Sequence, residues 1–231
     1  MRAKNPSTES VILLHGLARS SRSMLKMNAA LKNAGYSVFN CNYPSRKQPI
    51  ELLSVNTIAQ AIQHCLEEYH PTRIHFVTHS MGGIMVRYYL SQHSVPVLGR
   101  VVMLGPPNAG SELVDRLSGY QLFALINGPA GKQLGTEASS LPKSLGPVDY
   151  EVGIIAGNKN LNLLSSILIP GDHDGKVSTQ SARLEGMADF IQLPVSHSFM
   201  MNQQEVIQQT LYFLAQGSFN HKAKQPNQGV S

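Results

Sequence analysis

The run Thr78-His79-Ser80-Met81-Gly82-Gly83 decides the fold that this sequence predicts. It directly follows Arg73-Ile74-His75-Phe76-Val77, a pattern that indicates a short buried strand, and the residues after it, to Leu90, indicate a helix. A serine at a sharp strand-to-helix turn has a strained backbone and a hydroxyl that points out of the sheet. The free N–H groups of the new helix point at whatever this serine attacks. The segment therefore predicts a nucleophile at Ser80.

Further strands and helices alternate on both sides of this turn. Continuous apolar runs suit parallel strands that are covered on both faces, and the alternation implies right-handed crossovers. The expected strands, besides the one before Ser80, are residues 11–14, 36–41, 98–104, 151–156 and 189–193, and the expected helices are 23–33, 55–69 and 206–214. Gly35 is expected to end the first helix. The prediction is a single α/β domain over residues 1–217.

Residues 106–148 interrupt the alternation, because they are too long for a plain crossover. They contain a helical stretch, Glu112 to Ile126, followed by irregular sequence rich in Gly and Pro. Long insertions at the catalytic edge of a sheet often act as lids, so we expect a cap here, with a packed surface excursion as the alternative. Residues 218–231 are polar and predict a frayed tail.

The composition limits the class of protein. The 231 residues are 42% hydrophobic and 14% charged, which suits a globular domain. Net charge is +5, but the charges are scattered, which argues against a nucleic-acid partner. Cys41 and Cys65 are expected to be buried thiols and not a disulfide or a metal pair. No membrane span or apolar signal core is visible, so a cytoplasmic location is expected.

A nucleophilic serine needs a base, and the base needs an acid that orients it. In an open α/β sheet these groups lie at the carboxyl ends of strands. His197 follows the last expected strand, and Asp174 and Asp172 follow the fifth. We prefer Asp174 as the acid, because Asp-Gly-x-Val over residues 174–177 permits a tight turn.

Other interpretations of these aspartates remain open. Both are common turn formers before glycine. Asp172, His173 and Asp174 could also bind a metal such as calcium, although the ligand set is sparse. Asp149 and Glu112 are weaker acid candidates, because they lie outside the expected position.

Backbone amides are the expected oxyanion donors. Met81 follows the nucleophile at the start of its helix and is the first donor. Leu17 is the second, because Gly16 lets the loop after the first strand approach closely. His15 could orient this loop through a hydrogen bond.

Together these residues resemble the α/β-hydrolase superfamily, and more closely its bacterial lipase and esterase branch. The resemblance covers residues 9–215, and the chain order Ser, Asp, His is the order of that superfamily. Thr78 departs from the pattern Gly-x-Ser-x-Gly, because a β-branched residue needs extra room there. The matching segments are His15-Gly16-Leu17, residues 78–83, Gly105-Pro106-Pro107-Asn108-Ala109-Gly110-Ser111, Asp174-Gly175-x-Val177 and His197.

The resemblance implies a minimal α/β-hydrolase fold, with six mostly parallel strands in the order 2-1-3-4-5-6 and helices on both faces. It implies that Ser80, Asp174 and His197 cleave a carboxylic ester through an acyl-enzyme, without metal or organic cofactor. An acyltransferase or thioesterase with the same triad, or a non-catalytic binding protein, are the alternatives. The acyl pocket is expected to suit an uncharged, lipid-like or aromatic small-molecule ester, and its expected lining is Leu113, Leu117, Leu122, Phe123, Leu125 and Ile126.

Overall fold

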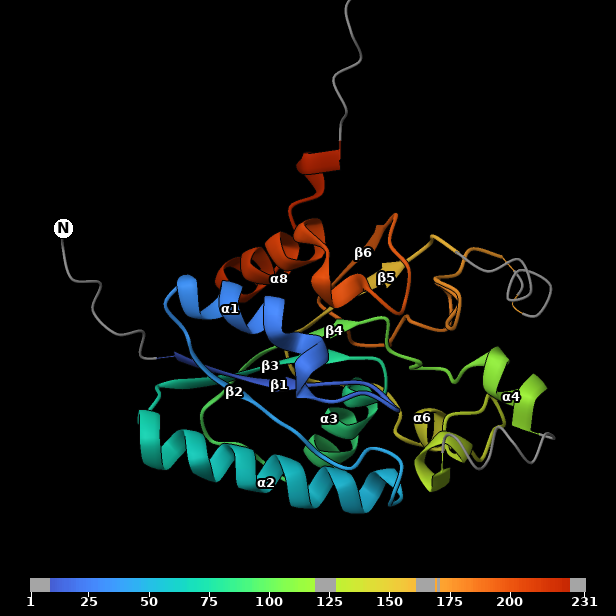
Figure 1. Cartoon of the computed structure of the whole chain (residues 1–231), viewed down its shortest axis with the longest axis horizontal. Coiled ribbons are helices and arrows are strands. Elements are labelled where there is room, and N and C mark those ends of the chain that lie inside the picture. Colours follow the sequence, from blue (N-terminus) through green and yellow to red (C-terminus); the bar gives the residue numbers. More distant parts are fainter. Residues whose placement is uncertain (1–8, 119–127, 161–168, 170, 225–231) are drawn as a thin grey trace, which may run out of the picture.

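Six parallel strands form the centre of the fold, with helices on both faces (Figure 1). The computed structural model describes residues 9–118, 128–160, 169 and 171–224. The strand order is β2-β1-β3-β4-β5-β6, which confirms the predicted order and the fold class. The strands are β1 (Glu9–Leu14), β2 (Ser37–Asn40), β3 (Arg73–His79), β4 (Leu98–Leu104), β5 (Val152–Gly157) and β6 (Asp189–Leu193).

The helices divide between the two faces of this sheet. In Figure 1, α1 and α8 lie on one face and α2 and α3 on the other, while α4 and α6 lie beyond the carboxyl ends of the strands. The helices are η1 (Ser21–Met24), α1 (Leu25–Asn33), α2 (Ile50–Tyr69), α3 (Met81–Gln92), α4 (Glu112–Ser118), α6 (Leu141–Ser144), η2 (Met200–Asn202), α8 (Gln204–Gln216) and η3 (His221–Lys224).

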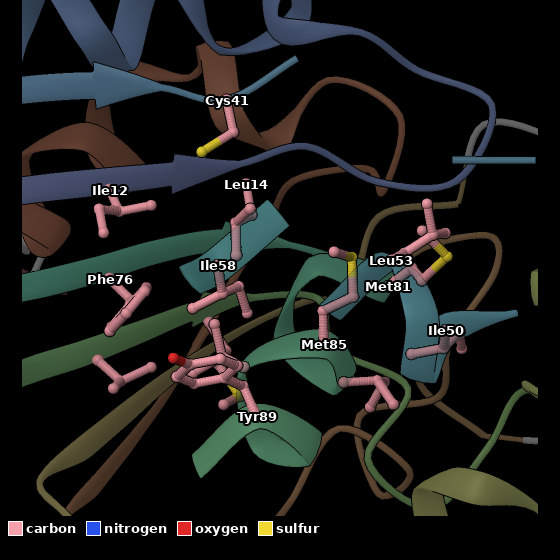
Figure 2. Close-up of a cluster of buried hydrophobic side chains, with 14 of the residues drawn as sticks. Ile12, Leu14, Cys41, Ile50, Leu53, Ile58, Phe76, Met81, Met85 and Tyr89 are labelled. Atoms are coloured by element: carbon pink, nitrogen blue, oxygen red, sulfur yellow. The ribbon is translucent and has the colours of Figure 1, made fainter. Parts of the chain in front are cut away.

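Alternate residues of β1 supply two separate cores. Val11 and Leu13 belong to the cluster under α1 and α8, whereas Ile12 and Leu14 belong to the cluster under α2 and α3. Figure 2 shows part of the second cluster. All four side chains are fully buried, and each such burial contributes about 1.5–3 kcal/mol relative to exposure. The continuous apolar run in the sequence therefore reflects a strand that is covered on both faces.

The end of α1 agrees with the local sequence signal, whereas the start of α2 does not. Gly35 has a φ of 104° just after α1, and the Tyr36 N–H bonds the Leu31 carbonyl oxygen at 3.1 Å, as expected for a glycine at the end of a helix. By contrast, α2 begins at Ile50 and not at the predicted Val55. Pro49 precedes it directly, and a proline is compatible with the start of a helix because no intrahelical donor is lost there.

The described part of the predicted helix in the insertion is α4, which begins at Glu112 as expected and is described to Ser118. The remaining residues, 119–127, lie outside the described residues.

The start of the tail differs from the sequence-based expectation. Residues 218–220 do not form a frayed tail, because Phe219 is buried against Phe213 with ring centroids 4.8 Å apart. The N–H of Asn220 also donates to the Gln209 side chain at 2.8 Å. One aromatic residue therefore fixes the start of a segment whose composition is polar.

Candidate active site

Ser80 occupies the predicted turn between β3 and α3. Its φ of 53° and ψ of −121° are backbone angles that L-residues rarely adopt. Such a conformation costs about 1–3 kcal/mol and persists where the surroundings enforce it. Here the Ser80 N–H donates to the Leu104 carbonyl oxygen at 2.8 Å, and its own carbonyl oxygen accepts the Gly83 N–H at 2.9 Å. The neighbouring strand and the first turn of α3 thus hold the serine in place.

The side chain of Thr78 packs beside Gly83, which leaves space for it. Thr78 is fully buried, and a Cβ atom added to Gly83 would lie 3.3 Å from its Oγ1 atom. At Gly82, a Cβ atom would lie 2.9 Å from the carbonyl oxygen of Leu14. The two glycines therefore let α3 begin close to β1 and leave space for a β-branched residue before the serine.

A hydrogen-bonded pair of Asp174 and His197 lies at the same edge of the sheet. Nδ1 of His197 donates to Oδ2 of Asp174 at 2.7 Å, and both side chains are almost fully buried. The backbone N–H of His197 also donates to the carbonyl oxygen of Asp174 at 2.9 Å. The other carboxylate oxygen, Oδ1, accepts the N–H groups of Lys176 at 3.0 Å and Val177 at 2.9 Å. These bonds orient the carboxylate toward the imidazole.

Asp172 and His173 have other partners. Asp172 is exposed and accepts a hydrogen bond from the Gln192 side chain at 3.2 Å, while Nδ1 of His173 accepts the Gly175 N–H at 3.1 Å. In the described part of the chain, no three His, Cys, Asp or Glu side chains gather as a metal site would require. Of the two candidate acids, the structure brings only Asp174 to His197.

Gly105 makes the approach of this pair possible. It follows β4 with a φ of 55°, and its N–H donates to the Ile155 carbonyl oxygen at 2.9 Å. A Cβ atom at this position would lie 3.0 Å from Oδ2 of Asp174 and 3.1 Å from Nδ1 of His197. Both the backbone conformation and the space beside the pair therefore require glycine.

His79 is a site residue that the sequence analysis missed. Its Nε2 atom donates to the backbone carbonyl oxygen of His197 at 3.0 Å, and the two rings have centroids 4.9 Å apart. A Cβ atom on Gly16 would lie 2.8 Å from Nδ1 of His79. One buried imidazole thus contacts the loop that carries His197 and the loop after β1. Its place directly before Ser80 was the only sequence signal for this role.

The loop after β1 lies beside the serine, as predicted. A Cβ atom on Gly16 would lie 3.2 Å from Cβ of Ser80, so the glycine permits the close approach. Nδ1 of His15 donates to the Gly16 carbonyl oxygen at 2.9 Å, and its ring stacks on Tyr43 with centroids 4.0 Å apart. The hydrogen bond expected of His15 is therefore present.

The two proposed donors have free backbone amides. The Ala18 N–H donates to Oγ of Ser45 at 3.1 Å, whereas no acceptor among the described residues pairs with the Leu17 N–H. Met81 is the first residue of α3, where a backbone N–H has no intrahelical partner. Both amides are therefore available to a ligand.

A pocket of about 110 Å³ lies where the loop after β1, the serine turn and the insertion meet. Ser80 and His197 both line it, but no hydrogen bond joins their side chains, a bond that in free enzymes often forms only when substrate binds. Leu113 lines the pocket as predicted, together with Leu17, Val114 and Leu134. Leu122, Phe123, Leu125 and Ile126 lie outside the described residues, as does the side chain of Leu117.

Comparison with known proteins agrees with this architecture. A family model described as the alpha/beta hydrolase fold matches residues 9–145, which is more than half of the chain.

The chain belongs to the α/β-hydrolase family.

Solved structures of a bacterial lipase and a bacterial phospholipase are similar to this one. The mature lipase BlEst2 of Bacillus licheniformis has a TM-score of 0.73 and 19% identity, with 92% of this chain and 94% of that chain covered. The phospholipase PlaB of Legionella pneumophila has a TM-score of 0.70 and 19% identity, covering 91% of this chain and 57% of that chain.

A lipase-esterase related protein of Clostridium acetobutylicum has a TM-score of 0.59 and 15% identity, covering 90% of this chain and 95% of that chain. No curated protein sequence matches this chain. At these identities the similarity establishes the fold of this α/β-hydrolase and leaves its chemistry to be argued from the site. In the described residues, no helix is long and apolar enough to cross a membrane.

Proposed function

We propose that this α/β-hydrolase is a serine hydrolase that cleaves carboxylic esters through an acyl-enzyme on Ser80. One observation carries the proposal: a serine with strained backbone angles lines one pocket with His197, and the buried Asp174 bonds this imidazole at the carboxyl edge of the sheet. A serine held this way suits a nucleophile, and an imidazole oriented by a carboxylate suits its base. Structures named as a bacterial lipase and a lipase-esterase related protein share this fold, so the fold is compatible with the same chemistry.

The proposed reaction has two steps. His197 takes the proton from Oγ of Ser80 as this oxygen attacks the ester carbonyl carbon, and the amides of Leu17 and Met81 bind the oxyanion. His197 then gives the proton to the leaving alcohol, and the acyl group stays on Ser80. Water, activated by the same imidazole, releases the acid and restores the serine. Asp174 keeps the imidazole oriented and stabilises its charged form.

The apolar residues that line one wall of the pocket are evidence that an acyl chain binds there. Leu17, Leu113, Val114 and Leu134 line the pocket, and the last three belong to the insertion over residues 106–148. We propose that this insertion acts as the cap of the site. An apolar wall suits hydrocarbon, because burial of apolar surface favours binding.

Labelling with a fluorophosphonate tests the proposal directly, because this reagent phosphonylates activated serines. We expect an adduct on Ser80 in the folded wild-type protein and none in Ser80→Ala. A wild-type protein that is not labelled and does not hydrolyse p-nitrophenyl esters would favour a binding protein on this fold. Transfer of the acyl group to an added alcohol, with little free acid formed, would favour an acyltransferase.

A further inference from the structure

The candidate pocket contains two cations. Arg19, in the loop after β1, and Lys176, in the turn after Asp174, line the same pocket as Ser80 and His197. No aspartate or glutamate is among the described residues that line it. The pocket therefore has an apolar wall and a positively charged part, although the insertion alone suggests an uncharged substrate.

Hydrogen bonds hold the segments of both cationic residues at the pocket, through the backbone of Lys176 and the side chain of Arg19. The Lys176 N–H donates to Oδ1 of Asp174 at 3.0 Å, and the Lys176 carbonyl oxygen accepts a hydrogen bond from Oγ of Ser111 at 2.8 Å. Nη2 of Arg19 donates to the Ser198 carbonyl oxygen at 3.3 Å, on the loop that carries His197. The two cations thus project from segments that also build the catalytic site.

Neither cation has an acidic partner. All fourteen aspartates and glutamates lie within the described residues, and none is within salt-bridge distance of Arg19 or Lys176. Asp174 is close to Lys176, but its two oxygens already bind backbone amides and His197. Lys176 is exposed, but the protein atoms around its ammonium group lower its pKa, and the nearby charge of Arg19 lowers this pKa further, against the opposing effect of Asp174. Two like charges near one another favour a bound anion.

We infer that Arg19 and Lys176 form an anion-binding subsite beside Ser80, and that the substrate is a carboxylic ester that also carries a carboxylate or phosphate group. The inference rests on the proposed function, because it names the substrate class of that same site. The anionic group pairs with the two cations, while the hydrocarbon part of the substrate contacts Leu113, Val114 and Leu134. Arginine and lysine both bind carboxylate and phosphate oxygens through charge-assisted hydrogen bonds.

Matched pairs of neutral and anionic esters test the inference and show whether the anionic group belongs to the acyl part or the alcohol part of the substrate. On the acyl side, 4-nitrophenyl hexanoate is compared with mono-4-nitrophenyl adipate, which replaces the terminal methyl group with a carboxylate. On the alcohol side, 1-hexanoylglycerol is compared with 1-hexanoylglycerol 3-phosphate. For each pair the ratio of kcat/KM for the anionic ester to kcat/KM for the neutral ester is measured in the wild type, Arg19→Gln, Lys176→Gln and Lys176→Glu.

We expect the ratio to exceed one for at least one pair and to fall roughly five- to tenfold in each Gln variant, as expected for loss of one partly screened charge. Lys176→Glu should lower the ratio further, and salt should lower it in the wild type, because ions screen exposed charges. Lys32→Gln is the control, since this exposed lysine lies in the last turn of α1 and should leave both ratios unchanged.

The outcomes separate the two proposals. If the wild type hydrolyses the neutral esters but shows no preference in either pair, or if the preference survives in all variants, the anion-binding subsite is wrong and the ester hydrolase stands. If no ester is cleaved and Ser80 is not labelled, the proposed function fails, and the inference fails with it.

Discussion

Nε2 of His79 donates a hydrogen bond of 3.0 Å to the backbone carbonyl oxygen of His197. The residue directly before the candidate nucleophile is thereby joined to the candidate base. Burial holds the pKa of His79 well below its usual range, and the nearby His197 adds to this effect. His79 therefore stays neutral, which avoids a second positive charge beside His197 when the latter takes a proton. The geometry suits a positioning residue.

We expect His79→Phe to lower kcat roughly 10- to 100-fold with a smaller change in KM, because a misplaced base costs rate more than binding. His79→Gln keeps an N–H donor and should recover most of the lost rate. Both constants are measured with one p-nitrophenyl ester. Equal losses in the two variants, or a loss confined to KM, would argue that the hydrogen bond does not position the base.

Gly105→Ala should inactivate the protein more than it destabilises it. The added methyl group would lie about 3 Å from the Asp174–His197 pair. The positive φ adds backbone strain on the order of 1 kcal/mol. Gly146→Ala is a matched control, because Gly146 has a φ of 65° but nothing within 4 Å of an added Cβ atom. Ester turnover and thermal unfolding are compared, and similar turnover in both variants would contradict the expectation.

Asp174→Asn should lower kcat by roughly 10⁴-fold, because an amide can hold the imidazole in the wrong tautomer and cannot stabilise its charged form. Asp172→Asn should change kcat less than tenfold, since the Asp172 side chain is exposed and bonds Gln192 and not His197. A steady-state comparison with one ester separates the two. A larger loss in the Asp172 variant would overturn the choice of acid.

Acid should destabilise the folded protein. Burial lowers the pKa of His15, His75 and His79, so the unfolded chain binds protons more readily than the folded chain. Stability is then fully present above about pH 6.5, the unfolded pKa, and is lost as the pH falls toward the lowered folded values. Each histidine contributes up to about 1.4 kcal/mol per pH unit in that window.

Urea unfolding at pH 7.5, 6.5 and 5.5 measures this dependence. His79→Gln removes one of the three titrating groups, so its free energy of unfolding should depend less steeply on pH than that of the wild type. An unchanged slope in this variant would show that His79 does not titrate on unfolding.

Much of the site could be predicted because its residues lie at positions that the chain order defines. Ser80 follows a buried strand, and Asp174 and His197 follow the fifth and sixth strands, so a parallel sheet brings all three to one edge. The start of α2 and the packing of Phe219 were not predicted correctly. Both depend on contacts far along the chain, since the Ile50 N–H donates to the Gln133 side chain at 2.7 Å and the Phe219 N–H donates to the Asp189 carboxylate at 2.7 Å.

The sequence by itself located the strands and the turn at Ser80, because hydrophobic runs and turn residues are local in the chain. The resemblance of its motifs to one family implied the order of the strands. Only the tertiary structure chose Asp174 over Asp172, joined His79 to His197 and brought Arg19 and Lys176 to one pocket. The physical reason is that hydrogen bonds and charge interactions act over a few ångströms. Residues far apart in sequence come that close only when the sheet has set its strands side by side.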